Sequence, residues 1–120
     1  MKSSLTIYKG EQAVYRNVRH AKHFLARLRG LLGRPPLKVG EGILLSPCGR
    51  IHTLGMRYRL DIIHLDKSGR VLKCVEGLKP NRYSASGKAR HTLEVREGSI
   101  ERNGIKVGDH LRWERKEHAK

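Results

Sequence analysis

Residues 48–66 read CGRIHTLGMRYRLDIIHLD, a stretch that joins a thiol, a histidine and an aspartate to the alternating pattern of a β-strand. Its residues 56–65 place Met56, Tyr58, Leu60, Ile62 and His64 on one face and Arg57, Arg59, Asp61, Ile63 and Leu65 on the other. Residues 66–69 (DKSG) predict a tight turn, and residues 71–75 return as the partner strand. Because titratable groups inside an apolar strand need specific partners, we expect the functional site in this stretch.

Further short strands are predicted on both sides of this stretch. They cover residues 5–8, 13–18, 42–46 and 92–96, and a last strand carries Val107, Leu111 and Trp113. Residues 77–88 predict a loop, and Asn103-Gly104 predicts a hairpin turn. The chain of 120 residues has the length of one domain. We therefore expect a mainly β fold over residues 1–120, either a compact jelly-roll-like β-sandwich or a barrel, with a frayed end at 114–120.

One amphipathic helix is predicted to begin at His20 and to end at Gly33. Its apolar stripe follows the spacing of 3.6 residues per turn and consists of Ala21, Phe24, Leu25, Leu28, Leu31 and Leu32. The glycine and the prolines at positions 35 and 36 stop the helix. We expect it to pack on the flank of the β structure.

Basic residues dominate the charge of the chain, with 26 Lys and Arg against 11 Asp and Glu and a net charge of +15. Two windows hold no acidic residue, one between Glu11 and Glu41 and the other between Glu76 and Glu94. A charge of this size attracts anions, so the expected partner is an anionic ligand or an acidic protein, with nucleic acid as an alternative. A solvated basic surface with no dedicated partner would have the same composition.

The N-terminal residues 1–12 contain no apolar segment of the kind that a signal peptide needs. No apolar run approaches the roughly 20 residues of a membrane helix, so no membrane span is expected. Cys48 and Cys74 agree with a reducing compartment in which thiols stay free. These features favour a cytoplasmic protein.

Several motifs follow one another in an order that is similar to a known family. They are Arg29-Gly30-Leu31-Leu32, Gly40-Glu41-Gly42, Cys48, His52-Thr53-x-Gly55-Met56, Leu60-Asp61-Ile62-Ile63-x-Leu65-Asp66, Leu93-Glu94-Val95 and Gly108-Asp109. Over about residues 14–112, this order resembles the bacterial and archaeal family called domain of unknown function 192. The resemblance implies a jelly-roll-like β-sandwich with a helix on its flank, and it implies no activity. Leu54, Arg59 and His64 replace an aromatic, a proline and an aromatic that are common in the family, so the aromatic cluster is thinner here.

Polar groups beside apolar strands make the region around residues 52–61 the candidate ligand site. Its candidate residues are His52, Thr53, Asp61, Arg29 and Cys48. If its strand face points inward, Asp61 is buried, and a buried carboxylate needs a partner. The candidate partners are Arg29, Arg57, Arg59, His52 and the backbone amides near Gly55. A structural pair that locks the strand to the neighbouring loop is favoured over ligand contact.

Two catalytic or metal-binding interpretations use the same residues. Cys48 and His52 have a spacing at which both can reach a zinc ion, with Asp61 or His64 as a further ligand. The chain has no second paired Cys/His motif, so we expect no metal and no cofactor. A nucleophilic site built on Cys48, His52 and Asp61 has suitable residue types but fits no known order or spacing. An enzyme is therefore the second alternative.

The loop over residues 77–88 combines cations with an aromatic ring. Its candidate anion or nucleic-acid contacts, with one cation beyond it, are Arg82, Tyr83, Lys88 and Arg90. Cations that hold phosphates beside a ring that stacks on a base are typical of non-specific nucleic-acid binding. We favour a non-catalytic module that binds an anionic small molecule, a glycan or a protein, with nucleic-acid binding as the first alternative.

Overall fold

The structure, a computed structural model, describes residues 4–22 and 35–116 and confirms the mainly β fold. Its elements are β1 (Ser4–Lys9), β2 (Gln12–Ala21), β3 (Glu41–Leu45), β4 (Arg50–His52), β5 (Leu60–Leu65), β6 (Val71–Leu78), β7 (Tyr83–Ala85), β8 (His91–Arg96), α2 (Ser99–Arg102) and β9 (Leu111–Arg115).

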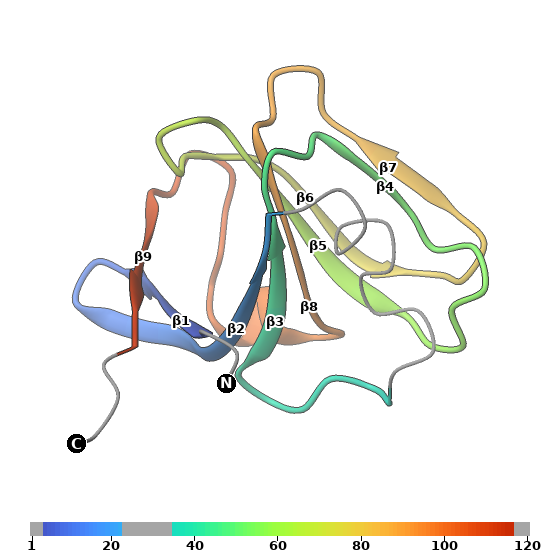
Figure 1. Ribbon diagram of the computed structural model, residues 1–120, viewed down its shortest axis with the longest axis horizontal. Coiled ribbons are helices and arrows are strands. Elements are labelled where there is room, and N and C mark those ends of the chain that lie inside the picture. The colour runs from blue at the N-terminus through green and yellow to red at the C-terminus, as the bar shows by residue number, and fades with distance from the viewer. Residues whose placement is uncertain (1–3, 23–34, 117–120) are drawn as a thin grey trace.

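Seven strands form one curled sheet that resembles half of a barrel, in the order β6-β5-β8-β3-β2-β1-β9 (Figure 1). Its neighbouring strands are antiparallel except β2 and β3, which pair in parallel. Strands β4 and β7 form a separate antiparallel pair, drawn at the right of Figure 1. The fold therefore combines a half-barrel with a small second sheet.

Strand β5 confirms the predicted alternation and is buried along its whole length. Ile63 and Leu65 belong to the main core inside the curled sheet. Leu60 and Ile62 point to the opposite face, where they pack in a second cluster with Ile51 of β4. Both faces of β5 are hydrophobic because the main core covers one and the small sheet covers the other.

The strand that we predicted over residues 56–65 begins only at Leu60. Met56 and Tyr58 still pack against the second cluster, whereas Arg57 and Arg59 are exposed. The alternation thus indicated the correct faces but not the start of the strand, since apolar side chains in a loop can pack against the same cluster as those of the strand.

Two turn predictions were wrong. Strand β7 lies within the predicted loop over residues 77–88, because it pairs with β4, which is distant in the sequence. Asn103-Gly104 ends the short helix α2 instead of forming a hairpin, and the positive φ of 63° at Gly104 suits the residue after a helix end. Val107 lies in an exposed turn before β9 rather than in the last strand.

The predicted flank helix can be compared with the structure only at its start. His20 and Ala21 are the last two residues of β2, so no helix begins at His20. Residues 23–33 of that prediction, with Arg29, lie outside the described residues. In the described part of the chain, no helix is long and apolar enough to cross a membrane.

Candidate functional site

A cleft of about 290 Å³ lies at one end of three neighbouring strands of the curled sheet. Leu60, the first residue of β5, pairs with Arg96, the last residue of β8, and residues 36–38 lead into β3 on the other side of β8. These three segments are far apart in the sequence. The antiparallel pairing of β8 with both β5 and β3 brings their ends together.

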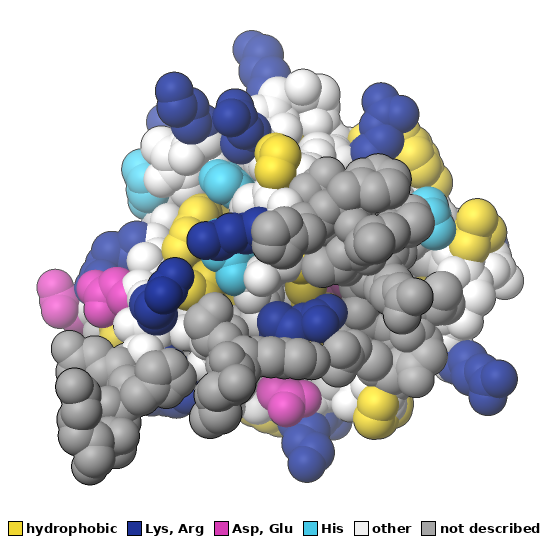
Figure 2. Space-filling model, in the orientation of Figure 1, with side chains coloured by type: hydrophobic (Ala, Val, Ile, Leu, Met, Phe, Trp, Pro, Cys, Tyr) yellow, Lys and Arg dark blue, Asp and Glu magenta, His cyan; other side chains and the backbone are white. Residues whose placement is uncertain are grey.

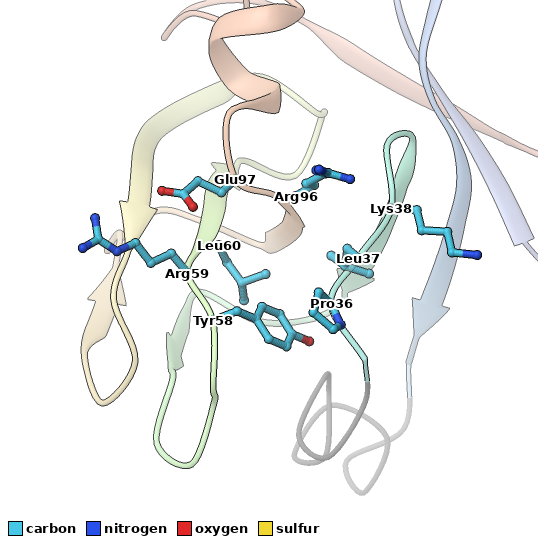
Figure 3. Close-up of a pocket in the computed structure, with 8 residues that line it drawn as sticks. All are labelled: Pro36, Leu37, Lys38, Tyr58, Arg59, Leu60, Arg96 and Glu97. Carbon is cyan, nitrogen blue, oxygen red and sulfur yellow. The ribbon is translucent and has the colours of Figure 1, made fainter.

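The lining of the cleft combines apolar and charged side chains. Pro36, Leu37, Tyr58 and Leu60 face one another across it, and the charged ends of Lys38 and Arg59 extend outward (Figure 3). The Tyr58 hydroxyl donates a hydrogen bond to the carbonyl of Pro35 at 3.2 Å, which ties the two sides of the cleft together. An apolar cleft with a few polar groups at its edge is the usual form of a small-molecule site.

Cations outnumber acids at the rim of this cleft. Lys38, Arg59 and Arg96 contribute three positive charges, and Glu97 contributes one negative charge. Among the described residues, no ion pair within 4.0 Å involves any of these four side chains. Among the described residues, the rim of the cleft therefore carries an excess of positive charge.

Asp61 follows Leu60 in β5 and is fully buried, and its carboxylate accepts hydrogen bonds from three backbone amides. One oxygen accepts a hydrogen bond from Gly77 N at 2.9 Å. The other accepts hydrogen bonds from Gly98 N at 3.1 Å and Ile100 N at 3.0 Å. The partners that we predicted among the described side chains do not contact it. Asp61 instead fixes the turn after β8, which carries Glu97, against β5.

Thr53 is also buried and joins two loops rather than facing solvent. Its hydroxyl donates to the carbonyl of Lys79 at 2.7 Å and accepts from Arg82 N at 2.8 Å. Its own N–H donates to the carbonyl of Arg82 at 2.8 Å, and its carbonyl accepts from Asn81 N at 2.9 Å. Thr53 therefore holds residues 79–82 beside the end of β4.

The three residues of the nucleophile hypothesis each have separate partners. The Cys48 thiol donates to the carbonyl of Arg50 at 2.9 Å, and His52 Nδ1 accepts from Leu54 N at 3.3 Å. The Asp61 carboxylate binds the three amides described above. Within residues 4–22 and 35–116, no group of three His, Cys, Asp or Glu side chains could hold a metal ion.

The predicted anion contacts lie in two places on the surface. Arg82 and Tyr83 are exposed beside His52, which pairs with Tyr83 in the small sheet. Lys88 and Arg90 are exposed farther along, in the segment between β7 and β8. The structure thus brings His52 together with Arg82 and Tyr83, which the sequence analysis had assigned to different sites.

The sequence analysis did not find the cleft. Pro36, Leu37, Arg96 and Glu97 belong to no motif, and Tyr58 was noted only as part of a strand face. The one available signal was the cluster of an aromatic and two arginines at positions 57–59, immediately before a buried strand. That signal does not reveal which other segments lie opposite.

His64 is buried between the two sheets and is fully hydrogen-bonded. Its Nε2 lies 2.8 Å from the Ser84 hydroxyl of β7, and its Nδ1 lies 3.0 Å from the Thr92 hydroxyl of β8. Because the Thr92 hydroxyl donates to the carbonyl of Cys48, it accepts from Nδ1, which therefore carries the proton. Burial, with a smaller effect of Lys73, lowers the pKa of His64 to about 4.

Glu94 is buried in the middle of the curled sheet, opposite Ile43 and Ile62. Burial raises its pKa to about 7, and the charge of Arg19 opposes this rise. The folded protein keeps the Glu94 proton up to about pH 7, whereas the unfolded chain releases it near pH 4.5. Glu94 therefore lowers stability as the pH rises through this window.

Replacing this buried acid, as Glu94→Gln, is expected to remove that pH dependence. The stability of the variant relative to the unchanged protein should rise by about 1.4 kcal/mol for each pH unit through the window between the two pKa values. Urea denaturation at a series of pH values measures this difference. Glu101→Gln, which changes an exposed acid, serves as the control. A constant difference across the window would show that Glu94 ionises normally.

The fold and the cleft together define a small, strongly basic, mainly β protein built on a half-barrel sheet. This chain belongs to the DUF192 family, described as "Uncharacterized ACR", whose model matches residues 5–113. The match confirms the resemblance that the motifs indicated and extends it at the N-terminal side.

Three other proteins are similar to this chain in sequence or in structure. A UPF0127 protein of Pyrococcus furiosus is 33% identical over 115 residues, which cover 92% of this chain and 97% of the relative. A solved structure of a protein of unknown function from Novosphingobium aromaticivorans has a TM-score of 0.77 and 26% identity, covering 91% of this chain and 83% of that one. A Sinorhizobium meliloti structure described as a "putative transcription regulator" has a TM-score of 0.80 over 94% of both chains. At 19% identity, this last likeness shows the fold alone.

Proposed function

We propose that this protein is a non-catalytic binding module whose cleft takes a small organic anion. The observation that carries the proposal is a cleft with apolar side chains on both sides, whose rim holds Lys38, Arg59 and Arg96 without ion-pair partners among the described residues. A volume of about 290 Å³ suits a small molecule better than a glycan chain or a protein segment.

The ligand that fits this cleft has a flat apolar body and one acidic group. The body lies between Tyr58, Leu37 and Leu60, where it loses contact with water. The acidic group stays at the mouth, within the positive field of the rim cations. The negative charge of Glu97 repels the acidic group of such a ligand and lowers its affinity. A ligand with a second acidic group on that side would be repelled more strongly.

The hydrogen-bond partners of Asp61, Cys48 and His52 favour binding over catalysis. Asp61 is saturated by backbone amides, and the Cys48 thiol and His52 point to separate partners. Nucleophilic catalysis needs a nucleophile and a base within hydrogen-bond reach of each other. We therefore assign Asp61 and Thr53 to positioning, and the ligand contacts to the walls and rim of the cleft.

The proposal can be tested with 4-nitrophenyl phosphate, a flat anion that also reports its own hydrolysis. Titration should shift the amide resonances of Leu37, Arg96 and Glu97 in NMR spectra. Arg96→Gln should weaken binding about two- to fivefold, and Glu97→Gln should strengthen it by a similar factor, as expected for single exposed charges. No 4-nitrophenolate should form above the blank.

The matched control is Arg70→Gln, which removes one exposed charge at the opposite end of β5. It should leave the affinity unchanged. If Arg70→Gln and Arg96→Gln weakened binding equally, the net charge and not the cleft would be responsible. If the probe were hydrolysed and Cys48→Ser abolished the reaction, the enzyme hypothesis would replace this proposal.

A further inference from the structure

The outer face of the small sheet is a second surface, separate from the cleft. In β4 and β7, Ile51 and Ser84 point inward, whereas Arg50, His52 and Tyr83 are exposed. Tyr83 is 61% exposed and lies directly opposite His52 in the pairing of the two strands. A large aromatic side chain that a small sheet presents to solvent has no role in the core of the protein.

The two segments that build this face contain no acidic residue. Residues 42–60 and 77–93 carry only cations among their charged side chains, namely Arg50, Arg57, Arg59, Lys79, Arg82, Lys88 and Arg90, of which Arg59 lies at the rim of the cleft and not on this face. Among the described residues, none of these seven forms an ion pair within 4.0 Å. Figure 2 shows basic, histidine and hydrophobic side chains beside one another at the right, over β4 and β7.

The fold joins these two acid-free segments along their length. The carbonyl of Arg90 accepts from Cys48 N at 2.8 Å, and the carbonyl of Gly49 accepts from Ser86 N at 3.0 Å. At the other end, Thr53 binds Arg82 through its backbone and its hydroxyl. Arg50, Arg82 and Lys88 therefore lie along two segments that hydrogen bonds hold side by side.

We propose that this outer face binds single-stranded nucleic acid without sequence preference. Phosphates of the strand lie against Arg50, Arg82 and Lys88, and an unstacked base packs on the ring of Tyr83. A single strand fits better than a duplex because an exposed ring can stack only on a base that is free of its neighbours.

Binding of a labelled oligothymidylate, followed by fluorescence anisotropy over a salt series, tests the proposal. Tyr83→Ala should weaken binding between about 5-fold and 150-fold, whereas Tyr83→Phe, which keeps the ring, should bind like the unchanged protein. The triple variant Arg50→Gln, Arg82→Gln and Lys88→Gln should lower the slope of log affinity against log salt by about 2.

The matched control removes three exposed cations elsewhere, as Arg16→Gln, Arg102→Gln and Lys106→Gln. It should change the slope much less than the triple variant on the small sheet. Equal effects of the two triple variants would overturn the proposal and assign binding to net charge. Absence of binding at low ionic strength would also overturn it, and binding of acidic vesicles or polyglutamate that depends on Tyr83 would identify a different partner class. None of these variants alters the cleft, so this test is independent of the anion proposal.

Discussion

Replacing Asp61 with alanine is expected to lower the free energy of unfolding by about 3–5 kcal/mol. The substitution removes the acceptor shared by the amides of Gly77, Gly98 and Ile100, in hydrogen bonds that are buried or partly buried. Urea denaturation of the purified variant measures the loss. The affinity of the cleft should fall as well, because the turn that carries Glu97 is no longer held against β5.

Asp66→Ala is the matched control for this experiment. Asp66 also accepts three hydrogen bonds, from Ser68 N at 2.9 Å, the Ser68 hydroxyl at 2.8 Å and Arg70 N at 3.0 Å. These bonds lie in an exposed turn where water can replace the lost acceptor, so the loss should be much smaller than for Asp61→Ala. Equal losses in the two variants would mean that burial of the Asp61 amides contributes nothing.

The second large effect is expected for Gly69→Ala, in the turn between β5 and β6. A Cβ atom at this position would lie 2.2 Å from the carbonyl oxygen of Leu111, and the residue has a φ of +98° that side chains disfavour. Because the obstacle is backbone and not a flexible side chain, the turn or β9 must move. We expect a loss of at least about 3 kcal/mol in the free energy of unfolding.

Gly108→Ala separates the two causes of this loss. Gly108 has nearly the same φ, +96°, but an added Cβ there would meet no atom within 4 Å. It should therefore lose only the backbone strain, about 1–2 kcal/mol, in the same denaturation measurement. If the two variants were equally destabilised, the close approach of Gly69 to β9 would be energetically unimportant.

Local patterns in the sequence predicted the elements that depend on neighbouring residues. The alternation before Asp66 and the DKSG turn identified the hairpin of β5 and β6, in which Ile63 pairs with Cys74. They also placed Asp61 on the same face as Ile63 and Leu65, so that its burial depended on that face pointing inward. The partners of Asp61 could not be predicted in the same way, since backbone amides have no signature in the side-chain sequence.

At the candidate sites, even less could be predicted from the sequence. The basic windows were visible as charge runs, and Arg82 and Tyr83 were recognised as a cation beside an exposed ring. The cleft was not visible, because Leu37, Tyr58 and Arg96 come from three separate segments and none of them lies in a charge or metal motif. The pairing of β4 with β7, which joins His52 to Tyr83, depended on a strand hidden in a predicted loop.

The sequence by itself determined the mainly β class, the family, the buried central strand and the excess of positive charge. The family follows from the order of its motifs, whereas the other three properties follow from composition and from the periodicity of neighbouring residues, which act over a few positions of the chain. Only the tertiary structure decided which strands are neighbours, and therefore which loops meet at the cleft and which basic segments share the outer face. Strand order depends on contacts between residues that are distant in the chain, and a shift of one residue in register would turn every side chain to the opposite face.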